Sequence, residues 1–88
     1  MKRTKIDIVH DMLRAIEDKG GRIIPTHLLY KSNLSHQRMK LYLDELKERK
    51  LLVEAHVKDK LVYELTDEGR KFLTQFKQVR EFTEAFGL

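Results

Sequence analysis

The feature that most constrains the fold of this chain is a change in the spacing of its apolar residues about halfway along the sequence. In the first half, apolar side chains recur every three or four residues, as on amphipathic helices. After that they alternate with polar side chains, as on strands with one buried face. Lys58-Asp59-Lys60 lies between two such runs and has the length of a hairpin loop. We therefore predict helices followed by one β-hairpin, whose buried side chains are Val53, Ala55, Val57, Leu61, Tyr63 and Leu65.

The first predicted helix covers about residues 5–19. Thr4 is expected to cap its start, and Gly20 suits the left-handed position that follows its last turn. Two apolar stripes run along it, formed by Ile6, Val9, Leu13 and Ile16 and by Ile8, Met12 and Ala15. One stripe can face the core of the chain, and the other then needs a different partner.

Two further helices are predicted before the hairpin. Residues 22–24 form a short extended piece, since a residue before proline is biased away from helix. Thr26 is expected to cap a short helix at 27–31, and Ser35 to cap a longer helix that ends near residue 50. A short helix, a tight turn and a longer helix make a helix-turn-helix.

The last predicted helix begins after Thr66 and continues to about Phe86. The expected fold class is α+β, mostly α: helix, short strand, helix, helix, a two-stranded wing and a long C-terminal helix. Residues 1–88 would be one domain, with a core at 4–65 and a C-terminal helix at 66–88.

Short motifs along the chain resemble those of winged helix-turn-helix transcriptional regulators. They are Asn33-Leu34-Ser35, Tyr42-Leu43, Leu46, Leu51-Leu52 and Tyr63-Glu64-Leu65-Thr66-Asp67-Glu68-Gly69. The chain is most similar to small archaeal members of this group, which include regulators and chromatin-associated proteins. The resemblance implies DNA binding and pairing of two subunits through the C-terminal helix. Many members have glycine before the first wing strand, where this chain has Lys50.

The positive charge of the chain is concentrated in its centre. The net charge is +4, and residues 19–43 contain five basic residues and no acid. These are Lys19, Arg22, Lys31, Arg38 and Lys40. The segment is either a solvated surface of a lysine-rich protein or a surface for phosphate groups.

The longer helix of the pair, about residues 35–49, is the predicted recognition helix in the DNA major groove. Such helices read bases with their N-terminal residues, which here are Ser35, His36, Gln37, Arg38, Lys40 and Leu41. Gln37 suits adenine, whereas Arg38 and Lys40 suit guanine or a phosphate. Leu41 would contact a thymine methyl group.

Other residues are expected to contact DNA outside the bases. Lys58 and Lys60, in the wing at 57–61, would reach an adjacent groove or phosphate. The resemblance implies phosphate contacts from Thr26, Lys31 and Asn33.

The C-terminal helix also predicts a homodimer. Its residues Phe72, Phe76, Val79, Thr83 and Phe86 are spaced alternately by four and three, as in the seam of a coiled coil. Phe82 and the second stripe of the first helix, represented by Ile8 and Met12, would complete the interface.

Other classes of function find little support in the sequence. Cysteine is absent, the four histidines are scattered, and no glycine-rich phosphate loop or nucleophile elbow is present. No apolar run has the roughly 20 residues of a membrane span. We therefore expect no enzyme, metal, cofactor, small-molecule ligand or membrane contact, and a cytoplasmic, nucleoid-associated protein.

Three functions agree with these observations. The first is specific or semi-specific binding of double-stranded DNA by a transcriptional regulator. The second is a winged helix that contacts another protein in a larger complex, and the third is a non-specific architectural chromatin protein. The acid-free stretch at 35–41 favours DNA over a protein partner.

Overall fold

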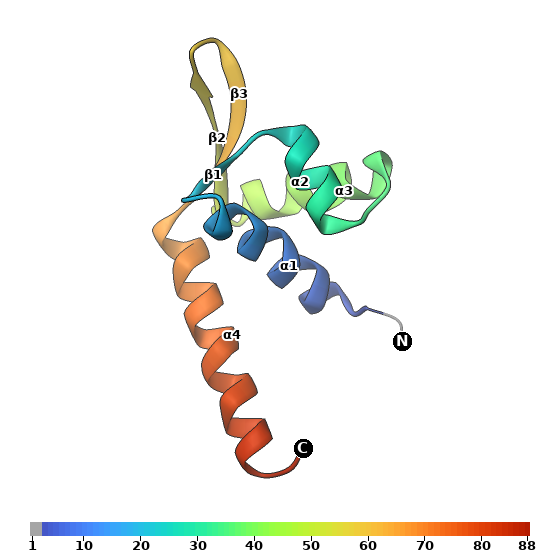
Figure 1. The fold of residues 1–88 in the computed structure, drawn as a ribbon, viewed down its shortest axis with the longest axis vertical. Coiled ribbons are helices and arrows are strands. Elements are labelled where there is room, and N and C mark those ends of the chain that lie inside the picture. Colours follow the sequence, from blue (N-terminus) through green and yellow to red (C-terminus); the bar gives the residue numbers. More distant parts are fainter. Residues whose placement is uncertain (1–2) are drawn as a thin grey trace.

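The computed structural model describes residues 3–88 and confirms the predicted fold class. In chain order the elements are α1 (Lys5–Asp18), β1 (Arg22–Ile23), α2 (Pro25–Ser32), α3 (His36–Glu48), β2 (Leu52–Val57), β3 (Lys60–Leu65) and α4 (Asp67–Ala85). Figure 1 shows the β2–β3 wing and the long helix α4 pointing in opposite directions from a core of α1, α2, α3 and the base of the sheet. The first two residues of the predicted domain, 1–2, lie outside the described part.

Helix α1 is the centre of the core. Thr4 and Asp7 form a capping box at its start, and its C-terminal end is closed by Gly20, whose φ of 85° is left-handed as predicted. The helix packs against α2, α4, β1 and β3, so both of its apolar stripes are covered except at Ile6, which is exposed. Ile8 and Met12 are buried inside one chain, and their predicted place in a dimer interface is therefore wrong.

The sheet is antiparallel with strand order β1-β3-β2. Leu52 lies opposite Leu65, and both are buried. Since side chains alternate along a strand, this register puts Glu54 on the core side, opposite Tyr63.

The prediction that Val53, Ala55 and Val57 face inward is wrong, because they lie on the other face of the wing. The predicted inward positions on β3, Leu61, Tyr63 and Leu65, do share the face of Leu52.

The wing ends in a two-residue turn rather than the predicted three-residue loop. Lys58 and Asp59 have φ of 51° and 64°, and Lys60 already pairs with Val57 in the ladder. Two consecutive positive φ angles are those of the turn whose twist matches a hairpin. Lys58 therefore lies at the tip of the wing, and Lys60 at the start of β3.

Helix α2 begins two residues earlier than predicted. Pro25 is its first residue and Ile24 takes the cap position, without a side-chain hydrogen bond. Proline suits this position because its missing N–H group would have no helical partner and its φ is already helical. Thr26 therefore lies in the first turn instead of capping it.

The end of α3, the start of β2 and the start of α4 meet at one junction. Lys50 has a φ of 60°, so it takes the left-handed conformation that glycine provides in similar proteins. Its carbonyl oxygen accepts a hydrogen bond from the Thr66 hydroxyl at 2.7 Å, and the same hydroxyl accepts one from the Gly69 N–H at 3.0 Å. Any side chain at Gly69 would overlap the Leu51 carbonyl oxygen. The angle between the wing and α4 is therefore set by backbone contact.

Helix α4 extends well beyond the core. It has 19 residues, which corresponds to about 28 Å, and the whole molecule measures 48 × 27 × 22 Å. Gly69 and Leu73 are its buried residues, and both lie in its first two turns. The second half of α4 therefore has little contact with its own chain, as Figure 1 shows.

The close approach of Gly69 to the Leu51 carbonyl oxygen predicts that Gly69→Ala destabilises the protein. Alanine normally stabilises a helix relative to glycine by about 0.5–1 kcal/mol, but here the new methyl group would push α4 away from Leu51. We expect the free energy of unfolding to fall by about 1–3 kcal/mol, measured by urea denaturation. Gln78→Ala, at an exposed position of the same helix, should change it by less than about 0.5 kcal/mol. Equal effects of the two substitutions would show that α4 does not depend on this close approach.

We expect the opposite result for Lys50→Gly. A non-glycine residue in the left-handed region costs about 1–2 kcal/mol, and part of this is offset by the greater freedom of glycine in the unfolded chain. The substitution should raise the free energy of unfolding by up to about 1 kcal/mol. Lys19→Gly is the matched control, because Lys19 ends α1 with a φ of −92° and glycine should weaken the fold there. A loss of stability with Lys50→Gly would contradict this reading of the helix end.

Candidate nucleic-acid interface

The first two turns of α3 form an exposed polar surface. The Ser35 hydroxyl accepts a hydrogen bond from the Arg38 N–H at 3.2 Å, which confirms Ser35 as the N-cap of this helix. Met39, Leu43 and Leu46 anchor the helix in the core. The predicted base-reading residues all lie on its exposed sides: Ser35, His36, Gln37, Arg38, Lys40 and Leu41. Leu41 is 67% exposed, so an apolar side chain lies at the C-terminal end of this surface.

The turn between α2 and α3 is held by a contact that sequence reasoning missed. One Arg3 nitrogen, Nη2, donates to the carbonyl oxygen of Ser32 at 2.9 Å, while Nη1 binds Asp11 at 3.0 Å. Asn33 then takes a left-handed conformation, which asparagine tolerates well, and buried Leu34 returns the chain to the core. Arg3 therefore holds the turn before α3 through Ser32, which is 29 residues away, a separation at which no local pattern could reveal the contact.

Helix α2 and the turn after it contain the residues that were predicted to contact phosphates. Thr26 and Lys31 are exposed, as is Asn33 in the turn. Tyr30 is 90% exposed and lies one helical turn after Thr26, so the two share a face. Sequence reasoning did not select Tyr30, because a tyrosine in an apolar-rich helix is usually a core residue.

Most of the cationic residues proposed to contact DNA are free of ion pairs in the described part of the chain. Within residues 3–88, none of Lys31, Arg38, Lys40, Lys58 and Lys60 takes part in an ion pair. Arg22, in contrast, binds Glu64 at 2.7 Å. Five unpaired cations thus lie on α2, the first half of α3 and the wing. Within residues 3–88, Lys19, Lys50, Lys71 and Lys77 are also unpaired, but they lie outside these elements.

The second half of α3 has the opposite character, because its charges are paired within the chain. Lys5 binds Glu45 at 2.8 Å and lowers the pKa of that carboxyl group below its ordinary value. Lys47 binds Glu54 of β2 at 2.6 Å, and this contact raises the pKa of the Lys47 ammonium group. Asp44 lies 3.7 Å from the same ammonium group. The available cationic surface therefore ends after Leu41. The first acid of the helix, Asp44, follows one turn later and would repel phosphate.

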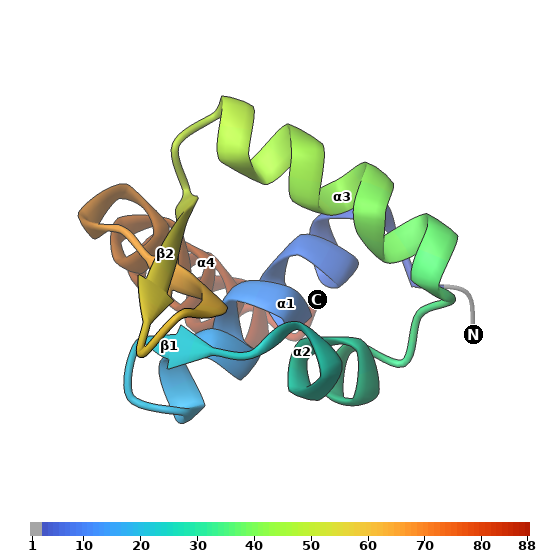
Figure 2. The ribbon, with the colours of Figure 1, turned by 90° about the horizontal axis from the view of Figure 1, so that it is seen from above.

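The wing forms a second projection, separate from the helix pair. Figure 2 shows α3 passing along one side of the molecule and α2 along another, with the wing beside the C-terminal end of α3. Lys58 and Lys60 are exposed at the wing tip. The predicted site residues thus occupy two regions, the helix pair with its turn and the wing tip.

The described part of the chain also bears on two other kinds of feature, a metal-binding cluster and a membrane-spanning helix. Residues 3–88 contain no cluster of three or more His, Asp or Glu side chains that could hold a metal ion. None of the helices in this range combines the length and the apolar character that crossing a membrane requires.

The arrangement of helices and wing agrees with a comparison to known families. The family model described as winged helix-turn-helix matches residues 2–84. The chain therefore belongs to the winged helix-turn-helix family. No curated protein matches it.

Several solved structures share this fold. Sso10a-2, a DNA-binding protein from Sulfolobus solfataricus, is 24% identical with a TM-score of 0.79, over 96% of this chain and 85% of that one. A winged-helix DNA-binding protein from STIV is 24% identical with a TM-score of 0.65, over 94% of this chain and 92% of that one. BpsR of Bordetella bronchiseptica, whose DNA binding is regulated by 6-hydroxynicotinic acid, is 23% identical with a TM-score of 0.72; the match covers 93% of this chain and 59% of BpsR.

Proposed function

We propose that this protein binds double-stranded DNA, with the first two turns of α3 in the major groove. The observation that carries the proposal is the exposed, acid-free and unpaired cationic start of α3 within a helix-turn-helix. A major groove admits an α-helix, and base edges are read by the N-terminal residues of such a helix. The DNA-binding proteins that share this fold support the proposal.

Each part of the surface has its own role in this proposal. Gln37 and Arg38 suit bidentate contacts with adenine and guanine, and Leu41 suits a thymine methyl group. Lys31, Asn33 and the first turn of α2 would contact backbone phosphates, which position the protein without reading sequence. Lys58 and Lys60 would reach phosphates or a groove beside the main contact.

The biological role that fits best is a nucleoid-associated transcriptional regulator with at least partial sequence preference. A purely architectural protein would bind all duplexes alike, and a protein-contact module would not bind them. Exposed Tyr30 and Leu41 are the two features that would suit a protein partner instead.

We further propose that the protein works as a homodimer joined by α4. Val79, Phe82 and Phe86 are 63%, 64% and 67% exposed, and the two phenylalanine rings lie 4.9 Å apart. Ile6, Phe72, Gln75, Phe76 and Val79 line an apolar groove of about 340 Å³ beside them. A second copy of α4 would cover both the groove and the exposed rings, and the seam spacing of α4 suits such pairing. Ile6 is exposed on α1, and in this proposal it would take the interface position that was predicted for Ile8 and Met12.

The DNA proposal predicts that substitutions in the wing change affinity alone, whereas substitutions in α3 also change sequence preference. Lys58→Ala and Lys60→Ala should weaken binding about equally on every duplex, because phosphate contacts are common to all sequences. Gln37→Ala and Arg38→Ala should also reduce the preference for a selected site by about 1–3 kcal/mol. Fluorescence anisotropy with a selected and a scrambled duplex measures both effects.

Two controls accompany this measurement. Lys71→Ala removes an exposed cation on α4, remote from the proposed surface, and should leave affinity unchanged. Affinity for the native protein should fall with salt, with about 0.9 added to the logarithmic slope for each neutralised phosphate. No salt dependence, or equal losses for Lys71→Ala and the wing variants, would refute the proposed interface.

The dimer proposal predicts a mass of twice the 10.5 kDa chain in light scattering at tens of micromolar. Val79→Asp with Phe86→Asp should give a monomer, because charges would replace the apolar side chains of the seam. Gln78→Asp, an adjacent exposed position, should leave the dimer intact. A native protein that scatters as a monomer would end this proposal without affecting the proposed DNA surface.

A further inference from the structure

One ion pair joins helix α3 to the wing. The Lys47 ammonium group donates a hydrogen bond to Glu54 of β2 at 2.6 Å, and Asp44 of α3 lies 3.7 Å from the same ammonium group. Within residues 3–88, Lys47–Glu54 is the only side-chain hydrogen bond or ion pair between α3 and the two strands of the wing. The two elements that carry the proposed DNA contacts are therefore linked at one polar point.

Glu54 lies where the sheet narrows from three strands to two. It pairs with Tyr63, and Tyr63 pairs on its other side with Ile23, the last residue of β1. Beyond this row the ribbon consists of β2 and β3 alone. Leu52 is the only buried residue of β2, while Leu61 of β3 is partly buried against the core. The ion pair therefore acts at the base of the two-stranded part, where it can set the direction of the wing without being needed to fold it.

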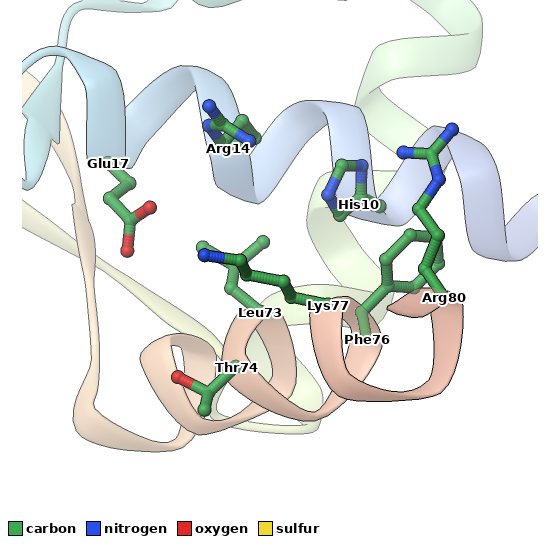
Figure 3. Close-up of a pocket in the computed structure, with 8 residues that line it drawn as sticks. All are labelled: His10, Arg14, Glu17, Leu73, Thr74, Phe76, Lys77 and Arg80. Atoms are coloured by element: carbon green, nitrogen blue, oxygen red, sulfur yellow. The ribbon is translucent and has the colours of Figure 1, made fainter. Parts of the chain in front are cut away.

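The attachment of α4 to α1 is of a different kind. The rings of His10 and Phe76 are stacked with centroids 4.1 Å apart, and Figure 3 shows the two rings between the side chains of Lys77 and Arg80. Ring stacking adds many weak contacts over an area, whereas an ion pair holds one point. The wing is therefore the projection whose direction a single polar substitution can change.

A small change of direction at Glu54 becomes a larger displacement at the wing tip. Lys58 follows Glu54 by four residues, which corresponds to about 13 Å along an extended strand. Over that length, a rotation of about 10° would move the tip by about 2 Å. This displacement is larger than the range of about 0.5 Å over which hydrogen-bond lengths vary. The contacts of the wing tip are therefore sensitive to how the base of the wing is held.

From this arrangement we infer that Lys47 and Glu54 are positioning residues for DNA binding. Their ion pair holds the wing in the direction in which its tip and the first two turns of α3 engage one duplex at the same time. The inference rests on the DNA binding proposed above. When two linked contacts engage together, the second becomes intramolecular, and its gain in affinity depends on how well the link fits both sites. Neither residue contacts DNA in this role.

The sign of one effect separates positioning from charge. Glu54→Ala removes a negative charge beside the proposed surface, so charge alone would make the affinity for DNA rise. Loss of the ion pair should instead lower affinity by about three- to tenfold, measured by fluorescence anisotropy with the full chain. Glu48→Ala is the matched control, because Glu48 is an exposed acid of α3 that forms no ion pair within residues 3–88. Its affinity should be unchanged or should rise.

Three further readouts distinguish positioning from a general loss of structure. Glu54→Ala should weaken binding equally for a selected and a scrambled duplex, because α3 still reads the bases while the wing contacts phosphates. In a chain that already carries Lys58→Ala and Lys60→Ala, it should no longer weaken binding, since the direction of the wing then has no effect. The exchange of Lys47→Glu with Glu54→Lys restores opposite charges and should recover most of the lost affinity.

A measurement without DNA tests the link itself. Residual dipolar couplings of the ¹⁵N-labelled chain give the direction of the wing relative to α3. Glu54→Ala should change them for residues 55–61, whereas Glu48→Ala should not. Unchanged couplings, a rise in affinity with Glu54→Ala, or a further loss in the chain without wing lysines would each overturn the inference. A native protein that binds no duplex would instead refute the proposed function, and with it any role of the pair in DNA binding.

Discussion

The rest of the structure depends on the burial of the apolar side chains of helix α1. Apart from Ile6, its two apolar stripes are covered by α2, by the sheet and by α4, so no single neighbour is sufficient to bury them. A chain of this length removes a smaller share of its surface from water than larger domains do, and each fully buried leucine or methionine contributes about 1.5–3 kcal/mol. The helix-turn-helix, the wing and α4 are therefore held in place by one shared element, and their relative positions depend on it.

This central position also explains how charge is distributed on α3. The second half of the helix lies between α1 and the wing, where Glu45 meets Lys5 from one side and Lys47 meets Glu54 from the other. The first half projects beyond both neighbours, and within residues 3–88 its cations form no ion pair. One helix thus combines a half that is tied into the fold and a half that is free for an external anion. The division follows the composition of the helix, because residues 35–41 contain no acid whereas the second half contains Asp44, Glu45 and Glu48. Packing then pairs Glu45 and Lys47 with neighbouring elements.

Much of the fold could be predicted from the sequence, because its determinants are local. Thr4, Ser35 and Thr66 cap their helices as their residue types suggest, and the change of apolar spacing correctly places the wing. The exposed start of α3 was also predicted correctly, since Met39 and Leu43 fix which side faces the core. The roles proposed for its residues remain predictions.

The errors have tertiary causes. The inward face of β2 is set by the pairing of Leu52 with Leu65, and alternation alone cannot choose between the two faces. The second stripe of α1 looked unpartnered because a single sequence does not show how many elements surround a helix. The contact of Arg3 with the α2–α3 turn links distant segments and has no local signature.

The open edges of the wing are a further feature that depends on tertiary structure. Since β1 pairs with β3 only at Ile23 and Arg22, both long edges of the ribbon are open beyond that point, and Val53 and Val57 lie exposed on one of its faces. Such an edge is a template for association with strands of other molecules, and lysines at its end oppose this. The positions of Lys58 and Lys60 at the end of the ribbon therefore have a consequence apart from DNA binding, because their charges oppose the pairing of this edge with a strand of another molecule.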